Sequence, residues 1–273
     1  MVRTSPTYRI ALGGLGAIGF KVARELDKGI PGLSLAAISA HDREGGASRV
    51  AGFAKPPPVM PLDALADHAD IIVECAPVSV FDQVAVPAIE AGCIFMPMSS
   101  AALLVRPKLI TRAQETGARI IIPTGALIGF DAVRAAAEGN IKSVRMKSIK
   151  PIEGLINSPY LKERGIDATH FKARSKIFDG TAIEAAAGFP ANVNITAALS
   201  LAGIGPDKTM LEIWADPHTK RNIHTVEVEA TETRFSVSIE GIPSPENPAS
   251  GLLTPLSLIA ALRSLTATLR VGS

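Results

Sequence analysis

The sequence contains little cysteine and few aromatic residues. Its 273 residues include 2 cysteines, 2 tyrosines and 1 tryptophan, and aromatic side chains make up 4% of the chain. Two cysteines do not form a disulfide framework, and a chain of this length buries enough surface to fold without one. This cysteine usage is typical of a reducing compartment, so we expect a cytoplasmic protein. The shortage of aromatic side chains argues against a stacking platform for single-stranded nucleic acid.

An excess of charge of one sign is also absent, as are long apolar runs. The 28 lysine and arginine residues nearly balance the 26 aspartate and glutamate residues, and the net charge of +2 is not gathered in a basic stripe. We therefore expect no nucleic-acid partner. No stretch of about 18 apolar residues is free of charge and proline, so no membrane-spanning helix and no membrane association are predicted. The cysteines and histidines show no zinc-ligand spacing, and no metal site is expected.

Strand and helix patterns alternate over the first 123 residues. Between the predicted strands, apolar residues recur with helical spacing, as at Ile18, Val22 and Leu26. The run at 69–76 is continuously apolar, as required of a strand buried on both faces of a sheet. This order predicts an α/β fold with a doubly wound parallel sheet and right-handed crossovers. The predicted strands are residues 8–12, 33–39, 69–76, 93–98 and 119–123.

The pattern changes beyond residue 140. Three segments alternate apolar and polar residues, which indicates strands with one solvent-facing side, as in an antiparallel sheet. These segments are residues 141–149, 225–230 and 234–240, and helices are expected at 129–139, in part of 183–203 and at 256–269. We therefore predict two domains, residues 1–123 and 124–251, with a C-terminal helix at about 252–273 packing back on the first.

A glycine-rich turn follows the first predicted strand. Residues 14–19 (Gly-Leu-Gly-Ala-Ile-Gly) match the pattern G-x-G-x-x-G between a strand and a helix. The first glycine allows the tight turn, the second lets the backbone approach a pyrophosphate, and the third lets helix and strand pack closely. Free N–H groups at the positive end of the helix then bind phosphate. We expect a dinucleotide site here, with contacts from Gly14, Gly16, Ala17, Ile18 and Gly19.

The residues that would select between the two nicotinamide dinucleotides are not decided by the sequence. An acidic residue about 20 positions after the glycine turn normally holds the ribose hydroxyls. The second predicted strand ends near Ser39 and Ala40, and neither is acidic. Asp42 could hold the hydroxyls of NAD, and Arg43 could meet the 2′-phosphate of NADP, but both also suit a solvated loop. The expected cofactor is therefore NAD or NADP.

Several later segments are similar to one family. They include Val73-Glu74-Cys75-Ala76, the run from Pro123 to Ala132 (PTGALIGFDA), Asn192-Val193-Asn194, Trp214-Ala215-Asp216-Pro217 and Asn222-Ile223-His224. Together with the glycine turn, they make the chain resemble the L-aspartate dehydrogenases over nearly its whole length. The resemblance implies a Rossmann-type dinucleotide-binding domain, a second α+β domain for substrate binding and dimerisation, and a homodimer. It also implies reversible oxidative deamination of L-aspartate to oxaloacetate and ammonia through iminoaspartate, which can feed NAD biosynthesis.

The resemblance implies catalytic and cofactor-binding roles for particular residues of this chain. The catalytic histidine of the family falls on His224, and cofactor contacts fall on Ala126 and on an asparagine of the Asn192-Val193-Asn194 segment, for which Asn194 is favoured. Two segments depart from the family: residues 99–103 (Ser-Ser-Ala-Ala-Leu) lack the glycine of its serine-glycine-alanine loop, and residues 150–153 (Lys-Pro-Ile-Glu) differ from its Lys-Pro-Pro stretch.

The chemistry also favours His224 as the catalytic base. An imidazole titrates near neutrality, so it can accept a proton from the substrate amine or from water. His218, six residues earlier, is the main competitor, and Asp216 or Asp131 could orient the imidazole. Cys75 lies in an apolar run and is expected to be an inert buried thiol. A dicarboxylate substrate needs cations, and the candidates, which the sequence does not rank, are Arg145, Lys147, Lys150, Lys220 and Arg221.

Two alternative functions remain open at this point. The chain could be a dehydrogenase or imine reductase of the same fold that acts on another small amino acid. It could instead be a non-enzymatic sensor that binds dinucleotide and reports redox state. The Asn222-x-His224 motif argues against the sensor, because a sensor has no need of a base.

Overall fold

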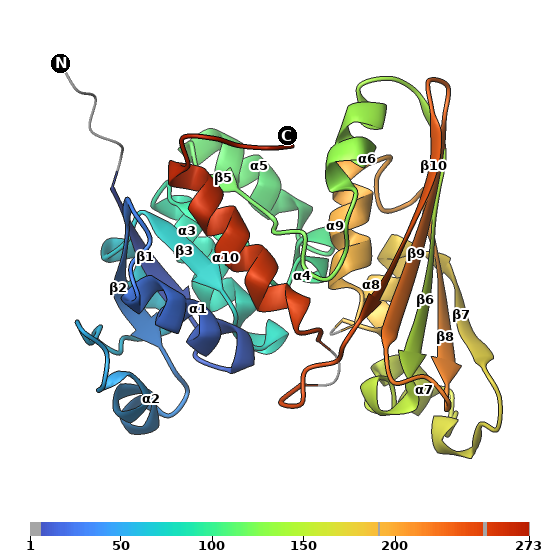
Figure 1. Ribbon diagram of the computed structural model, residues 1–273, viewed down its shortest axis with the longest axis horizontal. Helices are drawn as coiled ribbons and strands as arrows, with labels where there is room; N and C mark the ends of the chain where they lie inside the picture. The colour runs from blue at the N-terminus through green and yellow to red at the C-terminus, as the bar shows by residue number, and fades with distance from the viewer. Residues whose placement is uncertain (1–6, 191, 248–249, 273) are drawn as a thin grey trace. The chain divides into compact units, whose positions relative to one another are not determined.

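The computed structural model describes residues 7–190, 192–247 and 250–272, and the chain divides into two compact units (Figure 1). Unit 1 consists of Met1–Ser99, Arg106–Pro123 and Pro255–Val271. Unit 2 consists of Ser100–Val105, Thr124–Thr254 and Gly272–Ser273. Within the described ranges, no helix is both long and apolar enough to cross a membrane.

Unit 1 is built on a parallel five-stranded sheet with the order β2-β1-β3-β4-β5 (Figure 1). The strands are β1 (Tyr8–Gly13), β2 (Leu33–Ser39), β3 (Ile71–Glu74), β4 (Ile94–Pro97) and β5 (Arg119–Ile120). The chain runs from β1 to β2 and then returns to the other side of β1 to form β3. Open α/β sheets bind ligands at such a switch point, outside the carboxyl ends of the strands. The predicted doubly wound parallel sheet is confirmed.

Helices cover this sheet and complete its core. They are α1 (Ala17–Asp27), α2 (Arg43–Val50), α3 (Phe81–Glu90), α5 (Pro107–Thr116) and most of α10 (Leu253–Thr266). The apolar face of α1, with Val22 and Leu26, packs into one buried cluster with Ile10 and Leu12 of β1. Leu258, Ile259 and Leu262 of α10 belong to the same cluster, although more than 200 residues of sequence separate them from α1.

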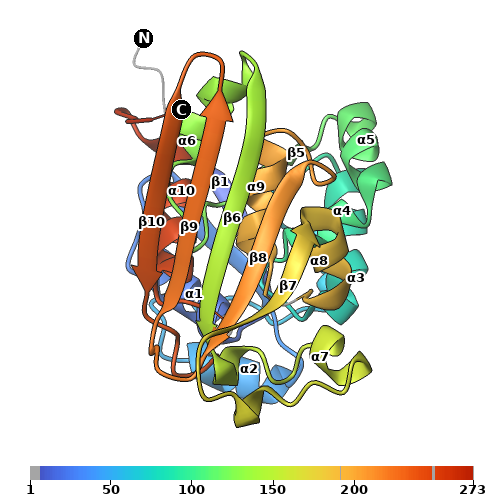
Figure 2. The same ribbon diagram turned by 90° about the vertical axis from the view of Figure 1, so that its right-hand side faces the viewer.

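Unit 2 contains a second five-stranded sheet, with the order β10-β9-β6-β8-β7 (Figure 2). The strands are β6 (Ile141–Pro151), β7 (Ser175–Thr181), β8 (Thr209–Asp216), β9 (Asn222–Ala230) and β10 (Arg234–Gly241). The expected antiparallel pairing is confirmed for the three predicted strands, since β9 pairs antiparallel with both β6 and β10, whereas β8, which was not predicted, is parallel to β6. The chain between them crosses over through two helices, α8 (Ala182–Gly188) and α9 (Asn194–Ala202), and such a crossover permits parallel pairing. The sheet is therefore mixed.

The two faces of this second sheet differ. Helices α8, α9 and α6 (Phe130–Ala137) lie behind the strands in Figure 2, and the side that faces the viewer carries strands alone among the described residues. Val144 and Met146 of β6 point to the helical side and are buried, whereas Arg145 and Lys147 alternate with them and are exposed. Further along β6, the buried row changes from apolar residues to Ser148 and Lys150.

Candidate active site

The glycine turn has the geometry of a phosphate-binding loop. Gly14 has φ +113°, and a Cβ there would come within 2.6 Å of the Cys75 carbonyl oxygen. A Cβ on Gly19 would overlap the carbonyl oxygen of Gly14. A Cβ on Gly16, by contrast, would meet no atom within 4 Å, and Gly16 precedes the first residue of α1 with no side chain capping that helix end. The turn therefore presents helix N–H groups beside open space, which fits a dinucleotide pyrophosphate.

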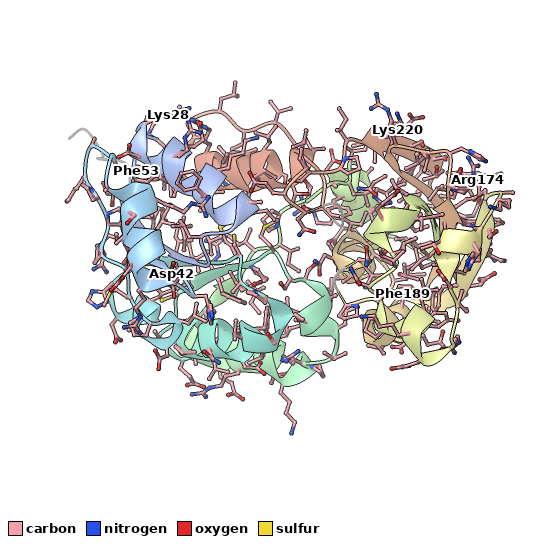
Figure 3. All side chains as sticks on the ribbon, turned by 90° about the horizontal axis from the view of Figure 1, so that it is seen from below. Lys28, Asp42, Phe53, Arg174, Phe189 and Lys220 are labelled. Carbon is pink, nitrogen blue, oxygen red and sulfur yellow. The ribbon has the colours of Figure 1, made fainter. Side chains whose placement is uncertain are left out.

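The two predicted ribose-selecting residues begin helix α2. Asp42, which is labelled in Figure 3, is the N-cap of α2 and accepts a hydrogen bond at 3.0 Å from the Gly45 N–H. Arg43 is exposed, and no ion pair involves it among the described residues. A second cation, which the sequence did not reveal, contacts the turn itself. Arg49 donates a hydrogen bond to the Leu15 carbonyl oxygen at 2.7 Å and stacks over the ring of Phe20.

A buried carboxylate lies next to the glycine turn at the end of β3. Glu74 is paired in register with Gly13, and its side chain is fully buried. It accepts hydrogen bonds from the Ala76 N–H, the Ser99 N–H and the Ser99 hydroxyl at 2.9–3.1 Å. Burial raises the pKa of Glu74 to about 7, although these hydrogen bonds act in the opposite direction. Glu74 thus connects the loops that follow β3 and β4.

His224 lies in unit 2, on the buried face of β9. It is 3% exposed, and its Nδ1 atom is 3.0 Å from the hydroxyl of Ser148 on the paired strand β6. Burial, together with the positive charge of Lys150, lowers the pKa of His224 to about 3. The imidazole is therefore neutral at physiological pH and able to accept a proton. The competitor His218 is exposed, and its ring contacts the carbonyl oxygen of Lys172.

The orienting contact of His224 differs from the two carboxylates considered from the sequence. Asp216 bonds to the Arg174 side chain at 2.8 Å and to the His218 N–H at 2.9 Å. Asp131 is exposed in the first turn of α6. The side chain that contacts the His224 ring is Ser148, so the suggestion of an aspartate–histidine pair is wrong.

The structure also ranks the five candidate cations. Lys150 is 3% exposed and donates a hydrogen bond to the side-chain oxygen of Asn192 at 3.1 Å. Burial lowers the pKa of Lys150 to about 8. The other four candidates, Arg145, Lys147, Lys220 and Arg221, have exposed side chains. Lys150 is thus the candidate that lies with His224 on the inner face of the sheet.

The predicted cofactor contacts Ala126 and Asn194 belong to neighbouring parts of unit 2. The turn that contains Ala126 has Gly125 at φ +65°, and a Cβ there would approach Ile195, the residue after Asn194. The side-chain oxygen of Asn194 accepts a hydrogen bond from the Ala101 N–H at 3.1 Å, and its carbonyl oxygen accepts one from the Ser100 hydroxyl. Ser100 has φ −61°, so the loop that lacks the family's glycine does not need one.

Cys75 fits the inert thiol predicted from the sequence. Burial, and then the Glu74 carboxylate, raises the pKa of its thiol well above the ordinary value. In the part of the chain that the structure describes, no group of three or more histidine, cysteine or acidic side chains could hold a metal ion.

Two known family models each match one part of this chain. A family model described as "Homoserine dehydrogenase, NAD binding domain" matches residues 14–123. A second model, described as "Aspartate dehydrogenase, C-terminal", matches residues 131–265. The first match and the glycine turn identify a dehydrogenase-type dinucleotide-binding domain, for which NAD or NADP is the cofactor.

Similarity to individual proteins extends over the whole chain. An L-aspartate dehydrogenase of Bradyrhizobium diazoefficiens is 49% identical over 98% of this chain and 95% of its own length. An L-aspartate dehydrogenase of Methanosarcina mazei is 34% identical over 97% of this chain and 99% of its own length. The crystal structure of an aspartate dehydrogenase from Thermotoga maritima, 26% identical, superposes with a TM-score of 0.70 and covers 97% of this chain and 99% of that one. The chain belongs to the L-aspartate dehydrogenase family, so the predicted resemblance is confirmed.

Proposed function

We propose that this protein catalyses the NAD- or NADP-dependent oxidative deamination of L-aspartate to oxaloacetate and ammonia. The observation that carries the proposal is the buried cluster on unit 2, where a neutral His224 and the cation Lys150 lie on one sheet face in a member of this family. A base and a cation are what an amino acid with two carboxylates requires. A dinucleotide-binding sensor would need neither.

The proposed role of His224 is proton transfer. The substrate ammonium first loses a proton to the imidazole, which allows the Cα hydrogen to leave with its electron pair. The bound nicotinamide supplies the acceptor for this hydride. Water then adds to the resulting imine, His224 moves the protons, and ammonia leaves as the carbonyl forms. The contact between His224 Nδ1 and Ser148 fixes the ring, and Nε2 has no hydrogen-bond partner among the described residues.

The cofactor is proposed to bind chiefly to unit 1. Gly14, Gly16, Ala17, Ile18 and Gly19 form the pyrophosphate turn, which is supported by the open space at Gly16. Asp42 and Arg43 are the proposed contacts to the adenosine ribose. Ala126 and Asn194 of unit 2 are further proposed contacts, and the remaining amide N–H₂ of Asn194 is the donor, because its oxygen already accepts from Ala101.

Steady-state kinetics with L-aspartate and either cofactor tests this function. We expect reduced nicotinamide to form with L-aspartate, and to be consumed with oxaloacetate and ammonia. His224→Ala should lower kcat by about 10²–10⁴, the usual contribution of positioned acid–base catalysis, while cofactor affinity is kept. His218→Ala is the matched control and should retain activity. Turnover of another amino acid in preference to L-aspartate, or full activity of His224→Ala, would contradict the proposal.

We further propose a homodimer of this chain. Ile149, Trp214 and Ile223 are register neighbours on three adjacent strands, on the face of the unit 2 sheet opposite its helices. Ile149 is 7% exposed, whereas Trp214 and Ile223 are partly exposed, and partly exposed apolar residues on a sheet face are a suitable contact for a second copy. Light scattering after gel filtration should give twice the chain mass of 28.5 kDa. A mass of one chain at micromolar concentration would exclude a stable dimer.

A further inference from the structure

The inner face of the unit 2 sheet carries a buried cation without an anion. Lys150 is 3% exposed, and its ammonium donates to the neutral side-chain oxygen of Asn192. No carboxylate forms an ion pair with Lys150 within residues 7–190, 192–247 and 250–272. Removing a charge from water without a counter-ion destabilises a fold. The same site therefore favours the arrival of an anion.

A buried acceptor without a donor lies beside it. Asn222 is 3% exposed, and its Oδ1 atom has no hydrogen-bond partner among the residues that the structure describes. Asn222 is two residues before His224 on β9, so both side chains point to the same sheet face. The register pairs Ser148 with His224 and Ile149 with Ile223. Lys150 and Asn222 are the residues that follow this last pair on β6 and precede it on β9, so we infer that they lie near each other. Buried polar atoms are nearly always hydrogen-bonded, and an exception needs an explanation.

We propose, building on the deamination proposed above, that Lys150 and Asn222 form the substrate-recognition pair of this chain. The Lys150 ammonium pairs with a carboxylate of the amino acid, and Asn222 Oδ1 accepts a hydrogen bond from its nitrogen. An amino acid supplies both missing partners at once, because it carries an anionic oxygen and an N–H donor within a few bonds. The nitrogen stays a donor as ammonium, amine, imine and departing ammonia.

This pair also links substrate binding to the base. The charge of Lys150 contributes to the lowered pKa of His224 in the free protein. A bound carboxylate offsets that charge, so the imidazole becomes a stronger base when substrate is present. Lys150 then acts as a binding residue toward the substrate and as a positioning residue toward His224.

Binding measurements with two ligands separate the two roles. L-Aspartate contains both carboxylates and the nitrogen, whereas succinate has both carboxylates and no nitrogen. By calorimetry on the full chain, with and without NAD, Lys150→Met should weaken both ligands by about 10- to 100-fold, the range for hydrogen bonds to charged groups. Asn222→Ala should weaken L-aspartate by about tenfold and leave succinate unchanged. Lys147→Met, on the exposed face of the same strand, is the matched control and should change neither.

Three results would overturn the proposal: unchanged affinity of Lys150→Met for both ligands, an equal loss of succinate and L-aspartate in Asn222→Ala, or an equal effect of Lys147→Met. L-Asparagine identifies which carboxylate Lys150 binds. Lys150→Met should weaken the binding of L-asparagine if the α-carboxylate is bound, and leave it unchanged if the side-chain carboxylate is bound.

Thermal unfolding of each variant tests whether the substitution has disturbed the fold. Since the unpaired ammonium destabilises the fold, Lys150→Met should keep or raise Tm, and a lower Tm with unchanged affinities would indicate a structural lysine.

The same data separate this proposal from the proposed function. If the wild-type protein binds L-aspartate through this pair but forms no reduced nicotinamide, the deamination fails and the recognition pair stands. If Lys150→Met turns over L-aspartate with an unchanged KM, the pair fails and the deamination stands. In Lys150→Met, the acidic limb of the kcat/KM profile should also move to higher pH, because the cation no longer lowers the pKa of His224. An acidic limb that stays in place would mean that the charge of Lys150 does not act on His224.

Discussion

Burial of His224 should make the stability of unit 2 depend on pH. The ordinary imidazole pKa is 6.5, and in the folded unit it is lowered to about 3. Between these values the unfolded chain binds a proton that the folded unit does not, so stability is lost as pH falls below 6.5. On going from pH 7.5 to 5, linkage gives a loss of about 2 kcal/mol in the free energy of unfolding. His224→Gln, which does not titrate, should lack this loss.

The single tryptophan makes the effect measurable in unit 2 itself. Trp214 is in β8, so its fluorescence during urea unfolding reports on this unit. The difference in unfolding free energy between wild type and His224→Gln should change by about 2 kcal/mol between pH 7.5 and 5. The control His218→Gln, altered in an exposed loop, should follow the wild type. An identical pH dependence in wild type and His224→Gln would mean that the imidazole is not held neutral by the fold.

Three further predictions concern unit 1. Gly16→Val should keep Tm and weaken NAD binding by about tenfold or more, as expected for the loss of a charged hydrogen bond, because its side chain would enter the open space at the turn. Gly14→Val, the comparison variant, should instead lower Tm. Unchanged affinity of Gly16→Val for NAD in calorimetry would contradict the assignment of the turn to the pyrophosphate. Arg43→Ala should weaken NADP more than NAD in titrations, and equal effects would mean a solvated side chain. The pKa of Glu74 is raised to about 7, so its protonated form stabilises the fold and stability falls as pH rises from 4.5 through 7. Glu74→Gln should abolish a decline of about 2.5 kcal/mol in the free energy of unfolding between pH 5 and 8, measured by urea unfolding followed by circular dichroism. A decline retained in this variant would contradict the assignment.

Some elements could be predicted because their ends carry local signals. Helix α5 begins at Pro107 and ends before Gly117, which has φ +77°, and both residues are helix-end signals that the sequence shows. The sequence analysis did not predict strands β7 and β8, and the reason differs between the two. In β8, Met210 and Trp214 are apolar on the face opposite Leu211 and Ile213, which hides the alternation. In β7, a register shift next to Lys176 interrupts the alternation.

The site was less predictable because its contacts join distant parts of the chain. His224 was found through the resemblance, but its partner Ser148 is 76 residues away and is set by strand pairing. Lys150 could not be ranked among five cations, since the predicted strand ended at Ile149, two residues before the end of β6 at Pro151. When the strand is extended to Lys150, the sequence shows a pattern that singles out this lysine. Val144, Met146, Ser148 and Lys150 follow one face, so a buried apolar row continues into polar residues.

That row explains how one sheet combines a buried polar pair with a stable apolar core. Val144 pairs with Val228 and Met146 with Val226, and the next pair in the same register is Ser148 with His224. A shift of one residue would turn every one of these side chains to the other face, so the buried apolar pairs fix the polar pair that follows them. The register therefore determines both the packing of unit 2 and the position of its base. Substitutions at Val226 or Val228 that disturb packing should accordingly reduce activity through misplacement of His224, although neither valine is a proposed contact of the substrate.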